Sequence, residues 1–354
     1  MGRLAVYKYF SFLYLLATFA VSGFTFYGLF GGNVNPAGNA ARAMLVYVMP
    51  ALIAVNVLLL PYWLIRRRWH WAAIPVVTLL CCLPYCRTIY QFGNPEESKE
   101  AAQLSGIKVA TYNVAMFGHE TTGFIAQDIL AEMKRQKVEV LCMQEYADQS
   151  GDRDNADSYK EYFPYMAKGR SDMVVYSRFP IRGSKNIEFD QTNNSGMWAD
   201  IDAHGKQFRI FNVHLETTSL NRTLGKAAKL EAQGFKVEGN RVLSAVYGNY
   251  TRGMVVRAAQ AEEVAQEIAK STLPVVVCGD FNDVPYSYTY NTMLGPLVDG
   301  FKECGHGFMY TYRGGKKMFR IDYIFHSEQI TGVDYYKYEL TYSDHFPVFM
   351  KFQL

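Results

Sequence analysis

Aspartate and glutamate are absent from the first 94 residues of this 354-residue chain, and this absence constrains its fold more than any other feature. Three stretches in this region also lack lysine and arginine: residues 9–30, 43–65 and 69–86. They contain 22, 23 and 18 residues, and a membrane-spanning helix needs roughly 20 apolar residues. The sequence therefore predicts a helical membrane region over residues 1–94, with two to three transmembrane helices.

The third stretch is the weakest of these predictions, because it is short and contains Pro75 and Pro84. A cleaved signal peptide is the alternative for the first stretch, whose apolar run is longer than such peptides usually have. Basic residues favour the cytoplasmic side, which places the N-terminus and the cluster at residues 66–68 inside. With a third span, we expect an integral protein of a bacterial-type inner or plasma membrane, with its catalytic domain on the outer (periplasmic or extracytoplasmic) face. If the third stretch only lies in the interface, the domain is cytoplasmic.

Residues 95–104 form the expected linker, and residues 105–354 form the expected catalytic domain. Beyond residue 94 the chain has 29 basic and 33 acidic residues. This balance excludes the broadly basic surface of proteins that travel along nucleic acid. A transporter or channel is excluded as well, because the apolar stretches contain no carboxylate to line a pathway.

Short apolar runs from Ile107 onward repeatedly end in a polar residue at a turn. The pattern is typical of a β-rich α/β domain, with helices expected over residues 125–136 and 255–270. Polar groups at the ends of neighbouring strands converge on one rim of a sheet, so chemistry is expected there. The runs have the sequences IKVATYN, VEVLCMQE, MVVYSRFPI, FRIFNVH, LPVVVCGDFN, RIDYIFHS and SDHFPVFMKF.

Five of these strand ends have side chains suited to phosphoryl chemistry. Asp280 and Asn282 lie two residues apart after an apolar strand, which predicts side chains on one face, although an Asx turn that caps the strand is an alternative. A carboxylate can orient or deprotonate water, and a carboxamide can donate to a phosphate oxygen. His345 follows Asp344, and Asp322 offers a carboxylate that could fix its tautomer. The other three polar residues are His214, Asn113 and Glu145, of which the last two suit a hard cation.

In this order the set resembles the endonuclease/exonuclease/phosphatase superfamily over about residues 105–354, with GDFN and SDHFPV as the most diagnostic segments. The resemblance implies a four-layered α/β sandwich, two mixed sheets packed face to face between helices. It implies Mg²⁺, with Mn²⁺ or Ca²⁺ as substitutes, bound by Glu145 with Asn113 close by and Asp344 as a further carboxylate. It also implies that His345, oriented by Asp322, and Asp280 act on the attacking water. Asn282 and His214 then stabilise the phosphorus centre.

We therefore expect a metal-dependent phosphoester hydrolase, and the alternative is a non-catalytic, membrane-anchored binding or sensing module on the same fold. The substrate is a nucleic acid or a lipid or inositol phosphate head group, and no obligate protein partner is evident. Within the family, histidine at position 214 argues against abasic-site repair, because that branch typically has a tyrosine there. Asp172 departs from the family pattern, which has a small residue there. Residues 217–252 are basic, either as a phosphate- or lipid-binding element or as a solvated helical excursion.

Overall fold

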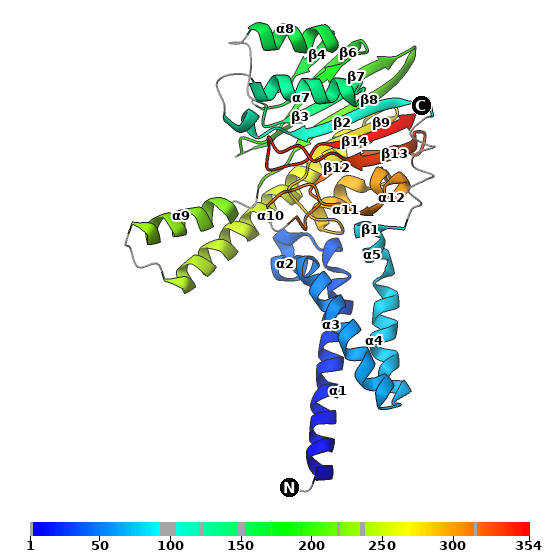
Figure 1. Ribbon diagram of the computed structural model, residues 1–354, viewed down its shortest axis with the longest axis vertical. Helices are drawn as coiled ribbons and strands as arrows, with labels where there is room; N and C mark the ends of the chain where they lie inside the picture. The colour runs from blue at the N-terminus through cyan, green and yellow to red at the C-terminus, as the bar shows by residue number, and fades with distance from the viewer. Residues whose placement is uncertain are drawn as a thin grey trace.

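The computed structural model describes residues 3–92, 104–119, 124–146, 153–170, 172–190, 192–217, 220–233, 238–314 and 317–354, so nearly all of the expected linker lies outside the described residues. A bundle of long helices leads into a layered domain (Figure 1). The N-terminal elements are α1 (Arg3–Gly28), η1 (Gly31–Asn33), α2 (Pro36–Ala43), α3 (Leu45–Ile65), α4 (Trp69–Cys81) and α5 (Leu83–Ile89). The helices that follow are η2 (Ala115–His119), α7 (Phe124–Arg135), α8 (Arg153–Tyr162), α9 (Leu220–Ala232), α10 (Gly239–Ala269), α11 (Tyr288–Leu294) and α12 (Gly300–Cys304).

Two six-stranded mixed sheets form the centre of the domain, in the orders β13-β14-β2-β3-β5-β4 and β10-β12-β9-β8-β7-β6. A short pair, β1 (Tyr90–Gln91) with β11 (Gly307–Phe308), joins the end of the membrane region to the domain. The strands of the first sheet are β2 (Ile107–Asn113), β3 (Val140–Gln144), β4 (Tyr165–Lys168), β5 (Val174–Ser177), β13 (Thr331–Lys337) and β14 (Val348–Gln353). Those of the second are β6 (Ile181–Glu188), β7 (Ser195–Ala203), β8 (Lys206–His214), β9 (Val275–Asp280), β10 (Val298–Asp299) and β12 (Asp322–His326).

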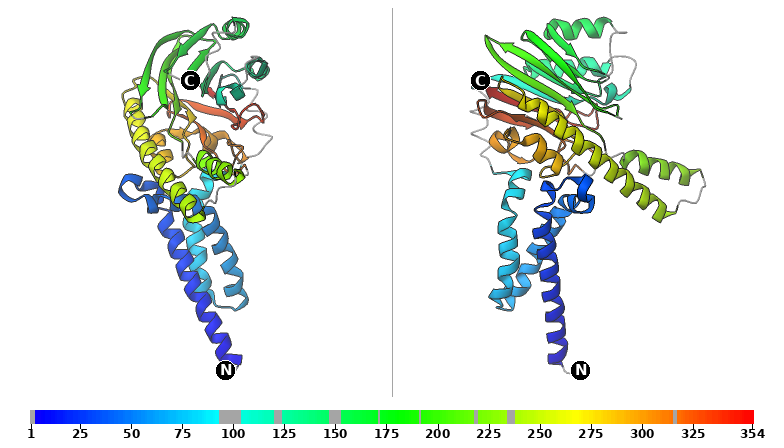
Figure 2. Two further views of the ribbon diagram at one scale, coloured as in Figure 1. Left: turned by 90° about the vertical axis from the view of Figure 1, so that its left-hand side faces the viewer. Right: turned by 180° about the vertical axis from the view of Figure 1, so that it is seen from behind.

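The two sheets pack face to face, and helices cover their outer faces (Figures 1 and 2). Strand residues alternate between faces, so β2 directs Val109 into the cluster between the sheets and Ala110 toward α7. On the second sheet, Val276 lies between the sheets and Val277 packs toward α10 and α11. The predicted four-layered sandwich is confirmed.

Several elements differ from the sequence-based expectation. The helix predicted over residues 255–270 is α10, which begins at Gly239 and is 31 residues long. Strands β7 and β13 were not predicted, because neither is a continuous apolar run. β7 alternates buried with half-buried residues over most of its length, and β13 has three buried residues between more exposed ends. The basic interval at 217–252 is helical in its described parts, as α9 and the first half of α10.

Each sheet contains one parallel pair at its centre, and both pairs end on the same rim. β2 runs parallel to β3, with Asn113 beside Gln144. In the other sheet β8 runs parallel to β9, with His214 beside Asp280. Because the carboxyl ends of parallel strands form a crevice in open α/β sheets, the rim expected from the sequence exists as a physical edge.

Within residues 3–92, two segments are long and apolar enough to cross a membrane, Val6–Asn33 and Pro36–Ile65. Helices α4 and α5 are bent by 46° relative to each other and qualify as a third span when taken together. Asn56 on α3 accepts a hydrogen bond from Ser22 and donates to Thr25, both on α1. Such polar contacts hold helices together where water is absent.

The N-terminal helices contact the domain through specific polar bonds. Tyr47 at the start of α3 donates to Asp283 over 2.5 Å, and Arg320 donates to the carbonyl of Thr88 on α5 over 2.9 Å. Gly32 packs so closely against the Tyr286 carbonyl that an added Cβ would lie 1.9 Å from its oxygen. The N-terminus and the turn between α3 and α4 lie at the end of the helices away from the domain (Figure 1).

Candidate active site

The sheet rim brings together all eight site residues expected from the sequence. Asn113 ends β2 and Glu145 directly follows β3, while His214 and Asp280 end β8 and β9. Asp322 opens β12, and its Cα pairs with that of Asp280 across the antiparallel ladder. The remaining three residues lie on the loops after β9 and before β14: Asn282, Asp344 and His345.

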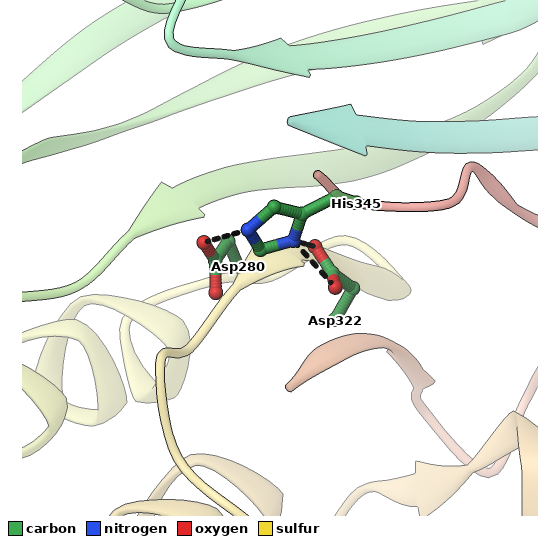
Figure 3. Close-up of side chains that lie close together, drawn as sticks. All are labelled: Asp280, Asp322 and His345. Atoms are coloured by element: carbon green, nitrogen blue, oxygen red, sulfur yellow. Dashed lines mark hydrogen bonds and ion pairs between the residues drawn. The ribbon is translucent and has the colours of Figure 1, made fainter. Parts of the chain in front are cut away.

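His345 connects two buried carboxylates (Figure 3). Its Nδ1 lies 3.1 and 3.0 Å from the two oxygens of Asp322, so Nδ1 carries a proton and Nε2 faces the rim. Nε2 is 3.6 Å from Oδ2 of Asp280. The Oγ1 of Thr311 accepts from the backbone N–H of Asp322, which fixes the strand that holds this carboxylate. The arrangement is that of an oriented acid/base imidazole.

Asn113 joins Asp280 to Glu145. Its Nδ2 donates to Oδ2 of Asp280 and to Oε1 of Glu145, each over 3.1 Å. Its Oδ1 accepts from the backbone N–H of Ala115, which sets the orientation of the amide. The Glu145 side chain is 36% exposed and Asp280 only 1%, so Glu145 stands at the mouth of the site and Asp280 at its base.

His214 approaches the same carboxylates from β8. Its Nε2 lies 3.7 Å from Oε1 of Glu145 and 3.9 Å from Oδ2 of Asp280. Its Nδ1 is 3.0 Å from Oδ2 of Asp172, which precedes β5 in the other sheet. Asp172, to which the sequence assigned no role, therefore orients this imidazole. The sequence feature that could have indicated this role is the position of a carboxylate directly before an apolar strand.

Asn282 and Asp344 complete the group at its edges. Asn282 lies outside β9 in a left-handed conformation, so the period-two argument that placed it on the same strand face as Asp280 was wrong. Its Nδ2 nevertheless lies 3.3 Å from Oδ2 of Asp280 and donates to the carbonyl of Leu215 over 2.9 Å. Asp344 is 58% exposed, with Oδ1 4.0 Å from Nε2 of His345.

The backbone is strained at the rim. Glu145 and Asn282 have φ angles of 49° and 51°, a region that most residues other than glycine avoid. Gly279 has φ 146°, and a Cβ there would lie 1.9 Å from the carbonyl oxygen of Val213 on β8. Only glycine fits at this point of the GDFN segment. Strain of this kind persists where the surrounding structure fixes a functional geometry.

Burial and mutual charge shift the ionisation of the site in the absence of a metal. Burial raises the pKa of Asp280 to about 6, although His345 and His214 act in the opposite direction. Burial lowers the pKa of His345, but the charges of Asp322 and Asp280 outweigh this and raise it to about 10. The pKa of His214 is also raised, because Asp172 and Asp280 outweigh the effect of burial.

A polar cross-link lies beneath the rim and joins the two sheets. Gln144 on β3 donates to Oδ1 of Asn212 on β8 over 2.6 Å and to Oγ1 of Thr111 over 2.9 Å. Asn212 in turn donates to the carbonyls of Met143 and Val174. These buried hydrogen bonds join β8 to β3 and β5 of the opposite sheet.

The donor set fits a hard cation. Five carboxylates lie around two imidazoles, and in the part of the chain that the structure describes no lysine or arginine forms an ion pair with any of them. Asp280, Asp322 and His345 have ligand-type atoms within 4.8 Å of one another. Both oxygens of Asp322, however, face the Nδ1 proton of His345, which leaves Glu145 as the more accessible oxygen donor. The five carboxylates belong to Glu145, Asp172, Asp280, Asp322 and Asp344.

Comparison with solved structures finds the same fold in proteins of low sequence identity. Humanised D. rerio TDP2 with 14 mutations is 16% identical, with 71% of this chain and 100% of that chain covered and a TM-score of 0.50. D. rerio TDP2 complexed with single-strand DNA product is 15% identical, with 71% of this chain and 100% of that chain covered and a TM-score of 0.50. An endonuclease/exonuclease/phosphatase family protein from Leptotrichia buccalis C-1013-b is 15% identical, with 70% of this chain and 100% of that chain covered and a TM-score of 0.50. These likenesses show the fold alone.

Comparison at the sequence level gives two family matches. No curated protein matches this chain significantly. Residues 10–89 match a domain of unknown function, DUF8431. Residues 110–345, about two thirds of the chain, match the model of the endonuclease/exonuclease/phosphatase family and include all eight site residues. The chain therefore belongs to the endonuclease/exonuclease/phosphatase family, whose members act on phosphoesters and generally depend on a divalent metal.

Proposed function

We propose that this chain is a membrane-anchored, Mg²⁺-dependent hydrolase of phosphoesters, with Mn²⁺ or Ca²⁺ as possible substitutes. The observation that carries the proposal is the excess of negative charge at the rim, where five carboxylates surround two imidazoles. Such a set is costly to hold in one place unless a cation offsets it. Its oxygen-rich composition favours a hard divalent ion.

Glu145 and Asn113 are the residues that would hold the metal, with Asp344 at the exposed side. Asn113 would do so through Oδ1, which would first have to give up its hydrogen bond from the backbone N–H of Ala115. When bound, Mg²⁺ supplies charge neutralisation at the phosphoryl oxygens and lowers the pKa of water. Asp280 is the proposed acceptor of the water proton, because its pKa of about 6 lies near neutrality. His345, held by Asp322, orients the same water.

His214 and Asn282 are the proposed donors to the phosphoryl oxygens. His214 Nε2 faces the carboxylates at 3.7 Å or more, and a phosphoryl oxygen would bring it a closer acceptor. Asn282 already donates to the Leu215 carbonyl, so it reaches a phosphoryl oxygen only by giving up a present contact. Donors aimed at the charge that develops in the transition state contribute strongly to catalysis.

The anchor favours substrates presented at a membrane surface or outside the cell. The arginines at residues 66–68 and the N-terminus lie at the end of the helices opposite the domain (Figure 1). With the basic end in the cytoplasm, the catalytic domain lies on the outer face. Protease added to sealed, right-side-out vesicles is expected to digest the catalytic domain, and complete protection would reverse this orientation.

The test uses the full chain in detergent micelles, offered bis-p-nitrophenyl phosphate, plasmid DNA and sphingomyelin with Mg²⁺ or with a chelator. We expect hydrolysis of at least one substrate, its loss on chelation, and a fall of about 100-fold or more in Glu145→Gln. The matched control is Glu328→Gln, an exposed residue after β12 at the end away from the rim. Turnover that survives chelation contradicts the proposed metal dependence. No turnover of any phosphoester contradicts the proposed hydrolysis and favours a binding or sensing module.

Electron paramagnetic resonance of bound Mn²⁺ separates the two possible metal positions. A metal on Glu145 and Asn113 has oxygen ligands and no directly bound imidazole, so strong nitrogen coupling should be absent. A metal held by Asp280, Asp322 and His345 would show the coupling of a ligating histidine. Detection of that coupling would move the proposed metal site to the second group.

A further inference from the structure

A helical arm projects from the catalytic domain beside the active site. We define the arm as residues 220–252, described over 220–233 and 238–252, which comprise α9 and the first part of α10. It follows β8, the strand that ends at His214, and it returns to the core at Gly253 and Met254, the first buried residues of α10. Asn249 donates to Oγ1 of Thr223, which ties the two helices together. The arm therefore projects beyond the layers formed by the two sheets and the helices that cover them (Figure 1).

The base of the arm lies where the membrane helices meet the domain. The ring of Tyr250 packs edge-on against that of Tyr47, with centroids 5.3 Å apart, and Tyr47 is the third residue of α3. Further along α10, Glu262 accepts a hydrogen bond from Asn35, directly before α2. From this level the arm extends sideways at about the height of α2, in Figure 1 and in the right-hand view of Figure 2. If α1 and α3 span a bilayer, the arm runs along its surface.

Apolar side chains of the arm are exposed. Leu243 is 68% exposed and Tyr247 50% exposed, and they lie four residues apart, so they share one face of α10. Leu230 on α9 is 44% exposed. A large exposed aliphatic side chain next to an amphipathic tyrosine is typical of helices that rest in the interfacial region of a bilayer.

The arm also has a charge opposite to that of the domain that bears it. Residues 217–252 contain six basic and two acidic residues, whereas the remainder of residues 95–354 contains 23 basic and 31 acidic residues. Lys226, Lys229 and Arg241 are exposed. A local positive element on an acidic domain favours an anionic partner. If α1 and α3 span a bilayer, the nearest extended surface at this height is that of the bilayer.

We propose that the arm is an interfacial element that lies on the membrane and binds the head groups of anionic phospholipids. Lys226, Lys229 and Arg241 contact the phosphates, and Leu243 with Tyr247 enters the boundary with the acyl chains. The arm thereby holds the rim at His214 close to the lipid surface. The proposal depends on the membrane helices and not on the proposed hydrolysis, so it stands or falls separately.

The experiment is hydrogen–deuterium exchange of the full chain in three settings: detergent micelles, nanodiscs of phosphatidylcholine, and nanodiscs of phosphatidylcholine with phosphatidylglycerol. We expect slower exchange over residues 239–252 in the anionic discs than in the other two. Each basic residue near an anionic surface contributes about fivefold to binding. The variant Lys226→Glu/Lys229→Glu/Arg241→Glu should therefore lose the protection.

The matched control reverses three exposed basic residues on the far side of the domain, Lys134→Glu/Arg135→Glu/Lys160→Glu, on α7 and α8. Figure 1 shows these helices at the end of the molecule opposite the membrane helices. This variant should keep the protection, and unchanged exchange over β8 and β9 verifies the fold of both. Three outcomes overturn the proposal: equal exchange in all three settings, equal protection in the two kinds of nanodisc, or protection that persists in the arm variant.

Discussion

Two histidine–aspartate pairs face Asp280, and each pair takes one residue from each sheet. His345, before β14, is bound by Asp322 of β12, and His214 of β8 is bound by Asp172, before β5. The hydrogen bonds have the same length, 3.0 Å, and both use Nδ1. What differs is the setting, because the Asp322 side chain is 1% exposed and that of Asp172 is 24% exposed.

The difference in exposure indicates how firmly each aspartate is held in place. Asp322 is fixed by the β9–β12 ladder and by Thr311, and in this dry position its charge helps to raise the pKa of His345 to about 10. Asp172 lies at a loop, where water can replace part of its contact with His214. We therefore propose that the inner pair, which orients the attacking water beside Asp280, contributes more to catalysis than the outer pair. The variants below test this ranking.

Removal of the inner imidazole should have the largest effect. We expect His345→Ala to lower kcat/KM for the best phosphoester substrate by about 1000-fold or more, because both its orientation of the attacking water and its contact with Asp280 are lost. The measurement is steady-state hydrolysis by the full chain in saturating Mg²⁺. His204→Asn, at an exposed turn with φ 56°, is the control and should retain activity. A loss below tenfold would remove His345 from the centre of the mechanism.

Loss of the inner carboxylate should come next. Asp322→Asn keeps the shape of the side chain but presents an amide to Nδ1 of His345, which favours the wrong tautomer, and we expect kcat/KM to fall by about 100- to 1000-fold. In chelator-treated protein, histidine NMR should show the pKa of His345 falling from about 10, because a charge that raises it is gone. A merely structural role would lower the thermal midpoint and leave this pKa unchanged.

The sequence predicts the inner pair, His345 with Asp322, but it does not predict the outer pair, His214 with Asp172. Asp322 and His345 lie in segments with family character, and the ends of apolar strands indicate a shared rim whatever their exact pairing. Asp172 precedes a strand whose position in the sheet no local pattern specifies. Its contact with His214 depends on the packing of two sheets, across 42 residues of chain.

Local bonding and packing also explain why Asn282 and strand β7 differ from the expectation. Asn282 seemed to continue β9 by its spacing, but β9 ends at Asp280, and the backbone amide of Asn282 donates back to that carboxylate. Such a turn is set by side-chain bonding, which competes locally with the strand. Strand β7 was hidden because one of its faces packs in the core while the other is partly exposed.

Loss of the outer carboxylate should have the smallest effect. We expect Asp172→Asn to lower kcat/KM by about tenfold, the lower end of what partners of active-site histidines contribute. The pKa of His214 should fall, because Asp172 raises it both by hydrogen bonding and by its charge, and His345 should keep its raised pKa. Histidine NMR on chelator-treated protein measures both. A loss as large as that in Asp322→Asn would make the two pairs equivalent and would mean that burial does not set their ranking.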